Sequence, residues 1–336
     1  MEKSGSPTLL FANLDLKPLQ PILWKGLHTE GAGRPVEYDP ACDLRALMLR
    51  QLEQIPYVKD LVKRLKREQK LRSACGYHDK APTEAHFSQM KKRVGVEGFK
   101  QIEKWLRHEA LRLRESKQPL ASMGLIQAAC LDGTDCEAWS SRDPNDTSKG
   151  RGDPEAKVGK GKKGFMLGYE SLFLVDMEGL PLGHVEAPLN VNEKRLVEPL
   201  LDEVLGEDVE VELIAGDSQL ESERVFGILE ERQIANVIAW RRLKGRENLP
   251  YVLVVKDRID VEGPEHLRVM YKRLRAMAES LNGRVKSRLD YYWLTWQGLA
   301  NACIHTSLVL SVVYAVVIAA ARLGKPELQY SIAYFA

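Results

Sequence analysis

The spacing of apolar residues changes at Pro119, and this change divides the chain into two parts of different architecture. Before Pro119, apolar residues recur at intervals of three and four, which places them on one face of a helix. After it, short apolar runs bounded by turn residues alternate with further helical segments, as in domains built on a sheet. The sequence therefore predicts an all-α part followed by an α/β part, a mixed sheet flanked by helices.

Four helices are expected between residues 39 and 118. Asp39 followed by Pro40 has the N-cap and the first-turn proline that start a helix, and Pro56 and the Gly76 region interrupt the block. A third helix is expected to start after Thr83, and a fourth follows it. The residues expected on the buried faces are Leu44, Leu47, Met48, Leu52, Val58, Leu61, Val62, Leu65, Phe87, Met90, Val94, Phe99, Ile102, Trp105 and Leu106.

Positive charge is concentrated in the same helical block. The whole chain has a formal net charge of +2, yet residues 39–118 hold 19 Lys and Arg against 11 Asp and Glu. Such a surplus favours a polyanion such as DNA as the partner of this block, and a solvated helix surface is the alternative interpretation. We divide the chain into an N-terminal extension (1–38), a basic helical domain (39–118) that is the candidate DNA-binding domain, and a third domain (119–336).

Composition excludes several other classes of protein. Hydrophobic residues make up 44% of the chain, which is too many for a mostly disordered protein. The five cysteines are scattered and form no CxxC pair, so a zinc ribbon and a disulfide scaffold are both disfavoured. A reducing cytoplasm is the expected compartment.

Residues 300–321 contain no Lys, Arg, Asp or Glu over about the length that spans a bilayer. Two interpretations follow: a membrane helix, or a core helix buried on most sides. Asn301 and His305 interrupt the apolar run, and nothing else in the chain resembles a membrane protein. We expect the core helix and no membrane partner.

The elements of the third domain can be placed by the same rules. Residues 125–131 are expected to form a strand that ends at Asp132, and residues 165–175 and 180–187 a hairpin. Residues 211–215 and 235–240 are expected to be strands, and residues 193–205 and 269–289 helices. Ser218 and Glu221 have the spacing of a capping box at the start of another helix. Residues 140–164, rich in Gly, Lys, Asp and Pro, are expected to form a mobile basic loop.

Two aspartates follow expected strands of this domain. Asp132 and Asp217 both stand where ligands of α/β sheets collect, beyond the carboxyl ends of strands. Carboxylates there can bind a hard cation such as Mg²⁺, although aspartates also end strands simply because they favour turns. Asp135 competes with Asp132, and we favour Asp132 because it directly follows the apolar run.

The expected helix at 269–289 carries a polar array. Tyr271, Arg275, Glu279 and Lys286 fall on one helix face, beside the apolar stripe of that helix. The array places a carboxylate between two cations and an aromatic ring. An exposed, salt-bridged face is the alternative, since Arg275 and Glu279 are four residues apart.

These features occur in a recognisable order together with several other motifs. The landmarks are LDGTD at Asp132, Arg142-Asp143-Pro144, Gly168-Tyr169, PLN at 188–190, IAGDSQLES at Asp217, R-x3-E-x6-K at Arg275, and the N-terminal CGYHDKAPTEAHFSQMKKR. In this order and placement the sequence resembles the DDE transposases of bacterial and archaeal insertion sequences, from residue 39 to the C-terminal helix.

The resemblance implies an RNase H-like catalytic core preceded by a helical domain. Asp132, Asp217 and Glu279 would be the three acids that hold two Mg²⁺ ions, which Mn²⁺ can replace. Arg275 and Lys286 would hold phosphates of the transposon end, and Tyr271 would contact DNA near them. The family usually has two residues between the tyrosine and the arginine, whereas this chain has three.

The resemblance also implies the partners and the reaction. The expected activity is cleavage of insertion-sequence ends and their joining to target DNA, so double-stranded DNA with terminal inverted repeats and target DNA would be the partners. A homodimer on DNA and a cytoplasmic, nucleoid-associated location in a bacterium or archaeon are expected. A catalytically silent, DNA-binding descendant is the alternative function.

Overall fold

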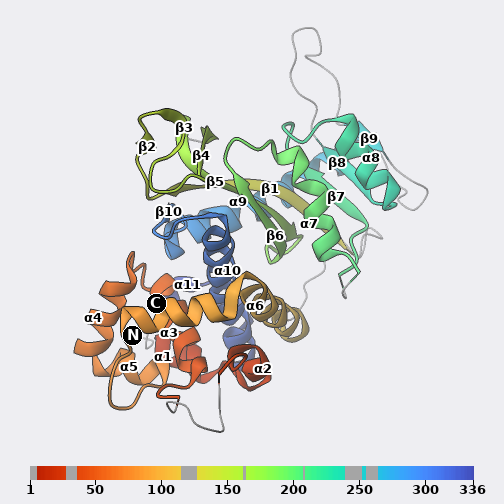
Figure 1. The fold of residues 1–336 in the computed structure, drawn as a ribbon. Helices are drawn as coiled ribbons and strands as arrows, with labels where there is room; N and C mark the ends of the chain where they lie inside the picture. Colours follow the sequence, from red (N-terminus) through yellow and green to blue (C-terminus); the bar gives the residue numbers. More distant parts are fainter. Residues whose placement is uncertain are drawn as a thin grey trace. The chain divides into compact units, whose positions relative to one another are not determined.

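The structure is a computed structural model that describes residues 6–27, 36–114, 127–161, 164–206, 209–238, 252–254 and 264–336 (Figure 1). The chain forms two compact units. The helical unit comprises Met1–Glu115, Arg284–Thr295 and Ala300–Ala336, and the sheet unit comprises Ser116–Gly283 and Trp296–Leu299. Each unit is described separately.

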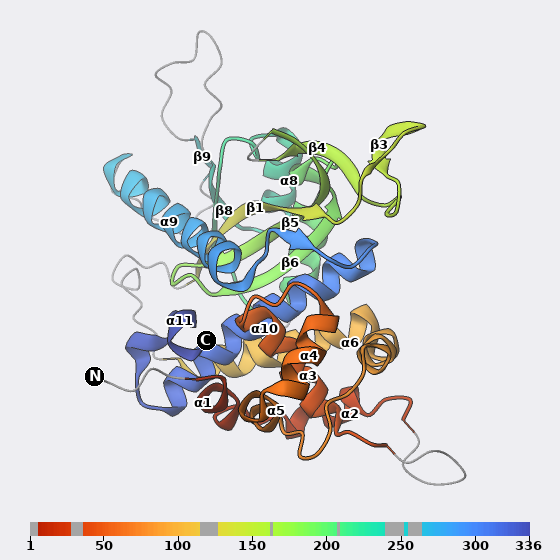
Figure 2. The same ribbon diagram turned by 90° about the vertical axis from the view of Figure 1, so that its left-hand side faces the viewer.

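The helical unit contains short and long helices from both ends of the chain (Figure 2). Its elements are α1 (Pro7–Ala12), η1 (Lys17–Leu19), α2 (Gln20–Leu23), α3 (Pro40–Leu52), α4 (Val58–Arg67), α5 (Gln69–Cys75), α6 (Glu84–Leu113), β10 (Trp293–Leu294), α10 (Leu299–Arg322), η4 (Pro326–Leu328) and α11 (Ile332–Phe335).

The predicted helices of residues 39–118 are present. The Asp39 side chain caps α3 by accepting a 2.9 Å hydrogen bond from the Ala41 amide. The apolar residues expected inside are buried, except that Val58 and Trp105 are half-buried. The third and fourth predicted helices are one element, α6, kinked at Gly95, whose φ of 66° and ψ of 177° are not helical.

Helix α10 belongs to the helical unit and is almost wholly buried. It is long and apolar enough to cross a membrane, and 94% of its most apolar window is buried inside the protein. Two of its hydroxyl groups bond to the preceding helical turn: Thr306 Oγ1 donates to the Ala302 carbonyl at 3.1 Å, and Ser311 Oγ donates to the Ser307 carbonyl at 2.6 Å. The imidazole of His305, on α10, contacts α3, where its Nδ1 lies 3.4 Å from Gln51 Nε2. The packing is therefore that of the core-helix interpretation.

Among the residues that the structure describes, the sheet unit combines a mixed sheet with helices (Figure 1). Its elements are β1 (Ala128–Ala138), β2 (Arg142–Asp143), β3 (Asp146–Gly150), β4 (Lys157–Gly161), β5 (Gly164–Asp176), β6 (Pro181–Pro188), η3 (Glu193–Arg195), α7 (Val197–Val204), β7 (Leu213–Gly216), α8 (Glu223–Glu231), β8 (Ala235–Ile238), β9 (Val252–Val254) and the greater part of α9 (Pro264–Leu289).

The strand order gives the fold class. β6, β5 and β1 are antiparallel neighbours, and β7 and β8 continue the sheet parallel to β1. Across the sheet, the five central strands follow one another as β6, β5, β1, β7 and β8. Along the chain, these are the third, second, first, fourth and fifth of the five strands. Helix α7 precedes the fourth strand, and α8 precedes the fifth. This is the RNase H-like arrangement that the resemblance implied: a mixed sheet flanked by helices, with helices N-terminal to it.

Three local predictions in this unit were wrong. β1 does not end at Asp132 but continues to Ala138. Thr134, Cys136 and Ala138 alternate as buried residues, and the pairing with β5 extends to Glu137. The expected mobile loop is largely β2, β3 and β4. Helix α8 begins after Ser222, whose Oγ accepts from the Val225 amide at 3.3 Å, so the predicted capping box at Ser218 is not formed.

Other predictions fell partly outside the described residues. Residues 125 and 126 of the first expected strand, residues 162 and 163 of the expected basic loop and residues 239 and 240 of the last strand lie there, as does the Pro119 boundary. The hairpin formed by β5 and β6 and the helix α9 are present as expected. The buried stripe expected on α9 is Leu274, Ala278, Leu281 and Val285, and all four are buried.

The two compact units differ from the expected domain boundaries. Residues 119–336 were expected to form one domain, and residues 1–38 an N-terminal extension. The C-terminal segment from Ala300 instead belongs to the helical unit, because the apolar α10 is covered by helices of that unit. The N-terminal α1 packs against α3, α5 and α11 in the same unit.

Candidate active site

The register of β1 and β7 brings two acidic residues together. The last registered pair between these parallel strands is Leu131 and Gly216, so Asp132 and Asp217 follow at neighbouring positions. Asp132 is buried, with 7% of its surface exposed. Asp217 Oδ1 accepts a 2.8 Å hydrogen bond from the Gln219 amide, which closes the turn after β7. Asp217 therefore has the turn-forming role considered for it and also lies beside Asp132.

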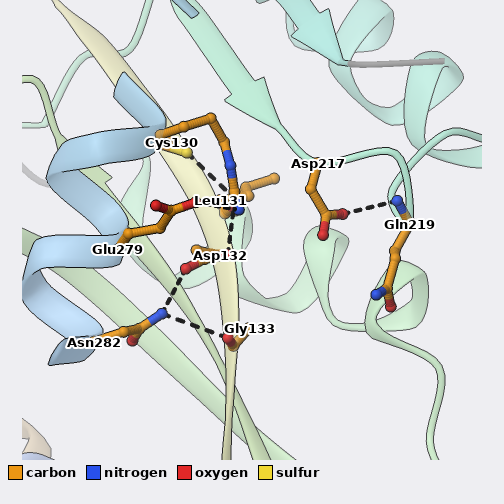
Figure 3. A network of polar contacts seen from close by, with 9 residues as sticks. Cys130, Leu131, Asp132, Gly133, Asp217, Gln219, Glu279 and Asn282 are labelled. Carbon is orange, nitrogen blue, oxygen red and sulfur yellow. Dashed lines mark hydrogen bonds and ion pairs between the residues drawn. The ribbon is translucent and has the colours of Figure 1, made fainter. Parts of the chain in front are cut away.

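Helix α9 supplies the third acidic residue. Glu279 extends from α9 on the side of β1 (Figure 3), and its side chain is 62% exposed. Arg275 is one turn earlier on the same face of α9 and connects the carboxylates of Asp132 and Glu279. Its Nη1 donates to Asp132 Oδ1 at 2.7 Å, and its Nη2 donates to Glu279 Oε1 at 3.3 Å.

The ion pair with Asp132 changes the acidity of Arg275. Burial alone would lower the pKa of the Arg275 guanidinium, but the Asp132 carboxylate raises this pKa above its usual value. Arg275 therefore stays charged and offsets part of the negative charge that the carboxylates place in the site.

Asn282 is a site residue that the sequence did not reveal. Its Nδ2 donates to Asp132 Oδ2 at 2.5 Å and lies 3.5 Å from the Gly133 carbonyl oxygen (Figure 3). Arg275 and Asn282 are seven residues apart, two helical turns, so they face the same side of α9. That spacing is visible in the sequence, but a neutral amide carries no signal of chemistry.

The three acids and Arg275 line one open pocket of about 850 Å³. The remaining lining residues are Gly133, Thr134, Asp135, Lys160, Gly161, Glu170, Glu193 and Gln219. Carboxylates therefore outnumber cations in this pocket. Lys160 comes from β4, in the segment expected to be a mobile loop.

Two glutamates lie on the other face of β1 from Asp132. Successive residues of a strand face opposite sides, and a side chain at Gly133 would meet the carboxyl oxygens of Glu193 and Glu170. Burial, followed by the contact with Glu193, raises the pKa of Glu170 to about 10. The pKa of Glu193 is also raised, by burial first. The sequence alone indicates no role for Glu170 and predicts Glu193 only as a helix residue.

The structure places the remaining candidate site residues, Asp135, Tyr271 and Lys286, differently from one another. Asp135, the competitor of Asp132, pairs with Glu170 across β1 and β5 and also lines the pocket. Tyr271 is half-buried near Arg275 and is not among the described residues that line the pocket. Lys286 is buried, 9% exposed, and its Nζ lies 5.6 Å from the centre of the Tyr292 ring, within the helical unit.

The donor chemistry of the pocket suits a hard divalent cation. Asp132, Asp217 and Glu279 offer carboxylate oxygens, the ligands that Mg²⁺ prefers. As the side chains lie, the described residues contain no ready-made group of three His, Cys, Asp or Glu that could hold a metal. At Asp132, Arg275 and Asn282 each bind one of the two carboxylate oxygens. The carboxylates are therefore the right kind of ligand for the ion, and Arg275 would have to leave Asp132 Oδ1 for the ion to bind there.

Comparison with known proteins gives one family match. The family described as a transposase domain (DUF772) matches residues 8–93, which lie in the helical unit. This match supports a transposase. No curated protein matches the chain significantly.

Three solved structures resemble the chain weakly. The piggyBac transposase synaptic complex with hairpin DNA is 11% identical, with 98% of this chain and 80% of that chain covered and a TM-score of 0.45. The Mos1 transposase paired-end complex is 13% identical, with 79% and 83% covered and a TM-score of 0.21. The Mos1 strand transfer complex is 13% identical, with 78% and 80% covered and a TM-score of 0.21. The fold assignment rests on the strand order rather than on these scores.

Proposed function

We propose that the chain is a DDE transposase that cleaves insertion-sequence ends and joins them to target DNA. The observation that carries the proposal is the meeting of Asp132, Asp217 and Glu279, from two adjacent strands and one helix, in a single pocket of an RNase H-like sheet. The transposase-domain match in the helical unit supports the same function.

In this proposal the three acids hold two Mg²⁺ ions, and Mn²⁺ can replace them. When bound, the ions supply charge stabilisation for the entering and leaving oxygens of an in-line displacement at phosphorus. Water forms a bond to the scissile phosphorus, the bond to the 3′-oxygen breaks, and a 3′-hydroxyl is released. That hydroxyl then attacks a phosphodiester of the target DNA, and the bond from the phosphorus to the target's 3′-oxygen breaks. The transposon 3′-end is thereby joined to the target's 5′-phosphate, and a 3′-hydroxyl of the target strand is released.

The chain's own cations would hold the DNA backbone around this reaction. Arg275 and Lys160 both line the acidic pocket and would contact phosphates at its rim. Lys286 and Tyr271 remain proposed DNA contacts on α9. In the helical unit, α4 exposes Lys59, Lys63, Lys66 and Arg67, which suits a phosphate backbone.

The proposed partners follow from the activity. They are double-stranded DNA with terminal inverted repeats, target DNA, and a second copy of the chain as a homodimer on DNA. The proposed location is the nucleoid of a bacterial or archaeal cytoplasm.

A catalytically silent, DNA-binding descendant is the second candidate. The observation that favours it is the engagement of both Asp132 oxygens, by Arg275 and by Asn282. A protein that had lost metal binding could retain this arrangement.

One experiment separates the two candidates. The full chain is incubated with a labelled duplex that carries the inverted repeat flanking its gene, with Mg²⁺, with Mn²⁺ or with EDTA. Cleavage at the repeat boundary is expected with the metals only, and Glu279→Gln should abolish it. Glu231→Gln, an exposed glutamate of α8, is the matched control and should cleave normally. Binding without cleavage in either metal would support the silent descendant.

A further inference from the structure

Asp132 is held by two side chains of α9 that differ in charge and in exposure. Arg275 binds Oδ1 with a charged guanidinium, and its side chain is 16% exposed. Asn282 binds Oδ2 with a neutral amide and is only 3% exposed. The two oxygens of one carboxylate therefore have partners of different kinds.

The orientation of the Asn282 amide is fixed by chemistry. An ionised carboxylate only accepts hydrogen bonds, so the amide nitrogen must face Asp132. Its Oδ1 is then left buried with no hydrogen-bond partner among the described residues. An unpaired buried acceptor destabilises a fold, so Asn282 is a poor choice for packing alone. What an asparagine adds at this position is the donor Nδ2, which bonds to Asp132 and to the Gly133 carbonyl.

The Arg275 contact is the exchangeable one. Arg275 lines the pocket and divides its guanidinium between Asp132 and the exposed Glu279. Asn282 is not among the described residues that line the pocket. A cation entering the pocket would therefore compete with Arg275 for Oδ1, while Oδ2 stays bound to α9.

We propose that Asn282 is a positioning residue that holds Oδ2 of Asp132, so that Oδ1 alone is exchanged between Arg275 and a divalent cation. This inference rests on the proposed function, because it concerns metal binding at the same site. A residue that holds a metal ligand in place affects the binding of the metal even where it never contacts it, typically by ten- to a hundredfold.

The test measures Mn²⁺ binding to the full chain without DNA, by electron paramagnetic resonance of the free ion. Asn282→Leu keeps the approximate size of the side chain and removes the donor. Mn²⁺ affinity should fall about ten- to a hundredfold, while the thermal midpoint of the metal-free protein stays close to that of the wild type. Unchanged Mn²⁺ affinity would overturn the proposal, as would a loss of affinity that only follows a loss of folded protein.

A double variant gives a readout that does not depend on packing a leucine. Asp132→Asn with Asn282→Asp keeps an amide–carboxylate pair and the net charge but moves the carboxylate to α9. We expect a wild-type thermal midpoint and weak Mn²⁺ binding; wild-type Mn²⁺ affinity would contradict the proposal. If the wild-type chain itself binds no Mn²⁺, the metal part of the proposed function fails, and this inference fails with it. If the wild type and Asn282→Leu bind Mn²⁺ equally, only this inference fails.

Discussion

Glu170 of β5 and Glu193 of η3 share a hydrogen bond between their carboxyl groups beside Gly133. Two ionised carboxylates cannot make this bond, because neither has a hydrogen to donate. The pair therefore retains a proton at neutral pH. Burial is the largest cause, and the charges of Asp135 and Asp217 add to it, so that the pKa of Glu170 rises to about 10.

Replacing Glu170 by glutamine should make stability less dependent on pH. The folded pKa of Glu170 is raised from 4.5 to about 10, so its contribution is fully present below pH 4.5 and is lost as pH rises toward 10. Each unit of pKa difference corresponds to about 1.4 kcal/mol. Glu170→Gln stays neutral and should raise the thermal midpoint relative to wild type more at pH 9 than at pH 5. Calorimetry at both pH values, with the exposed Glu231→Gln as control, checks this; an equal effect at both would contradict it.

Removing the guanidinium of Arg275 should strengthen metal binding in the absence of DNA. The positive charge that bridges Asp132 and Glu279 opposes a cation at the same oxygens. Arg275→Ala should raise Mn²⁺ affinity roughly tenfold, equivalent to about 1.4 kcal/mol, and weaken binding of the DNA end. Isothermal titration of the free protein measures the first effect. Lys272→Ala removes an exposed charge from the same helix and should change neither; a lower Mn²⁺ affinity in Arg275→Ala would argue against competition.

Alanine should be tolerated differently at two glycines of the sheet unit. A side chain at Gly168 would overlap the Cys136 carbonyl oxygen, where β5 approaches β1. Gly168→Ala should therefore destabilise the protein by about 1–3 kcal/mol. A side chain at Gly283, in α9, would meet nothing within 4 Å, so Gly283→Ala should stabilise it by about 0.5–1 kcal/mol. Urea unfolding of the two variants should give free-energy changes of opposite sign, and equal changes would be the contradictory result.

The exposed face of α4 should carry part of the DNA affinity. Lys63, Lys66 and Arg67 are exposed on it, whereas Arg64 is engaged by Glu53 and Glu68. Replacing the three exposed cations by alanine should weaken binding of duplex DNA. The slope of log affinity against log salt should decrease by about one for each phosphate that the variant no longer neutralises. Lys17→Ala with Lys25→Ala, two exposed lysines near the N-terminus, is the control; an unchanged slope in the α4 variant would exclude this face.

Helix periodicity predicted much of the fold because most apolar positions of the helices are on buried faces. The faces of α3, α4, α6 and α9 follow from spacing alone. The predicted β1 is too short because Asp-Gly-Thr-Asp has the composition of a turn. The alternation of Asp132, Thr134 and Cys136 as buried residues depends on pairing with β5, a long-range interaction that a local pattern does not report.

The site was predicted in part for a related reason. In a sequence, charged residues indicate a possible catalytic or metal-binding site, as Asp132, Asp217, Arg275 and Glu279 do here. Asn282 becomes recognisable only when its amide is seen against Asp132. Glu170 and Glu193 are 23 residues apart, and only the folding of η3 over Gly133 brings them together.

The position of α10 has a consequence for how the chain is synthesised. The helices α1 to α6 leave the ribosome first, whereas α10, the apolar helix buried in the same unit, is synthesised after all of them. During translation these helices are present without their principal buried partner, and their inner faces stay exposed until α10 emerges. Expression of residues 1–115 alone should therefore yield aggregated protein, so soluble production of the helical unit calls for a gene that also encodes α10.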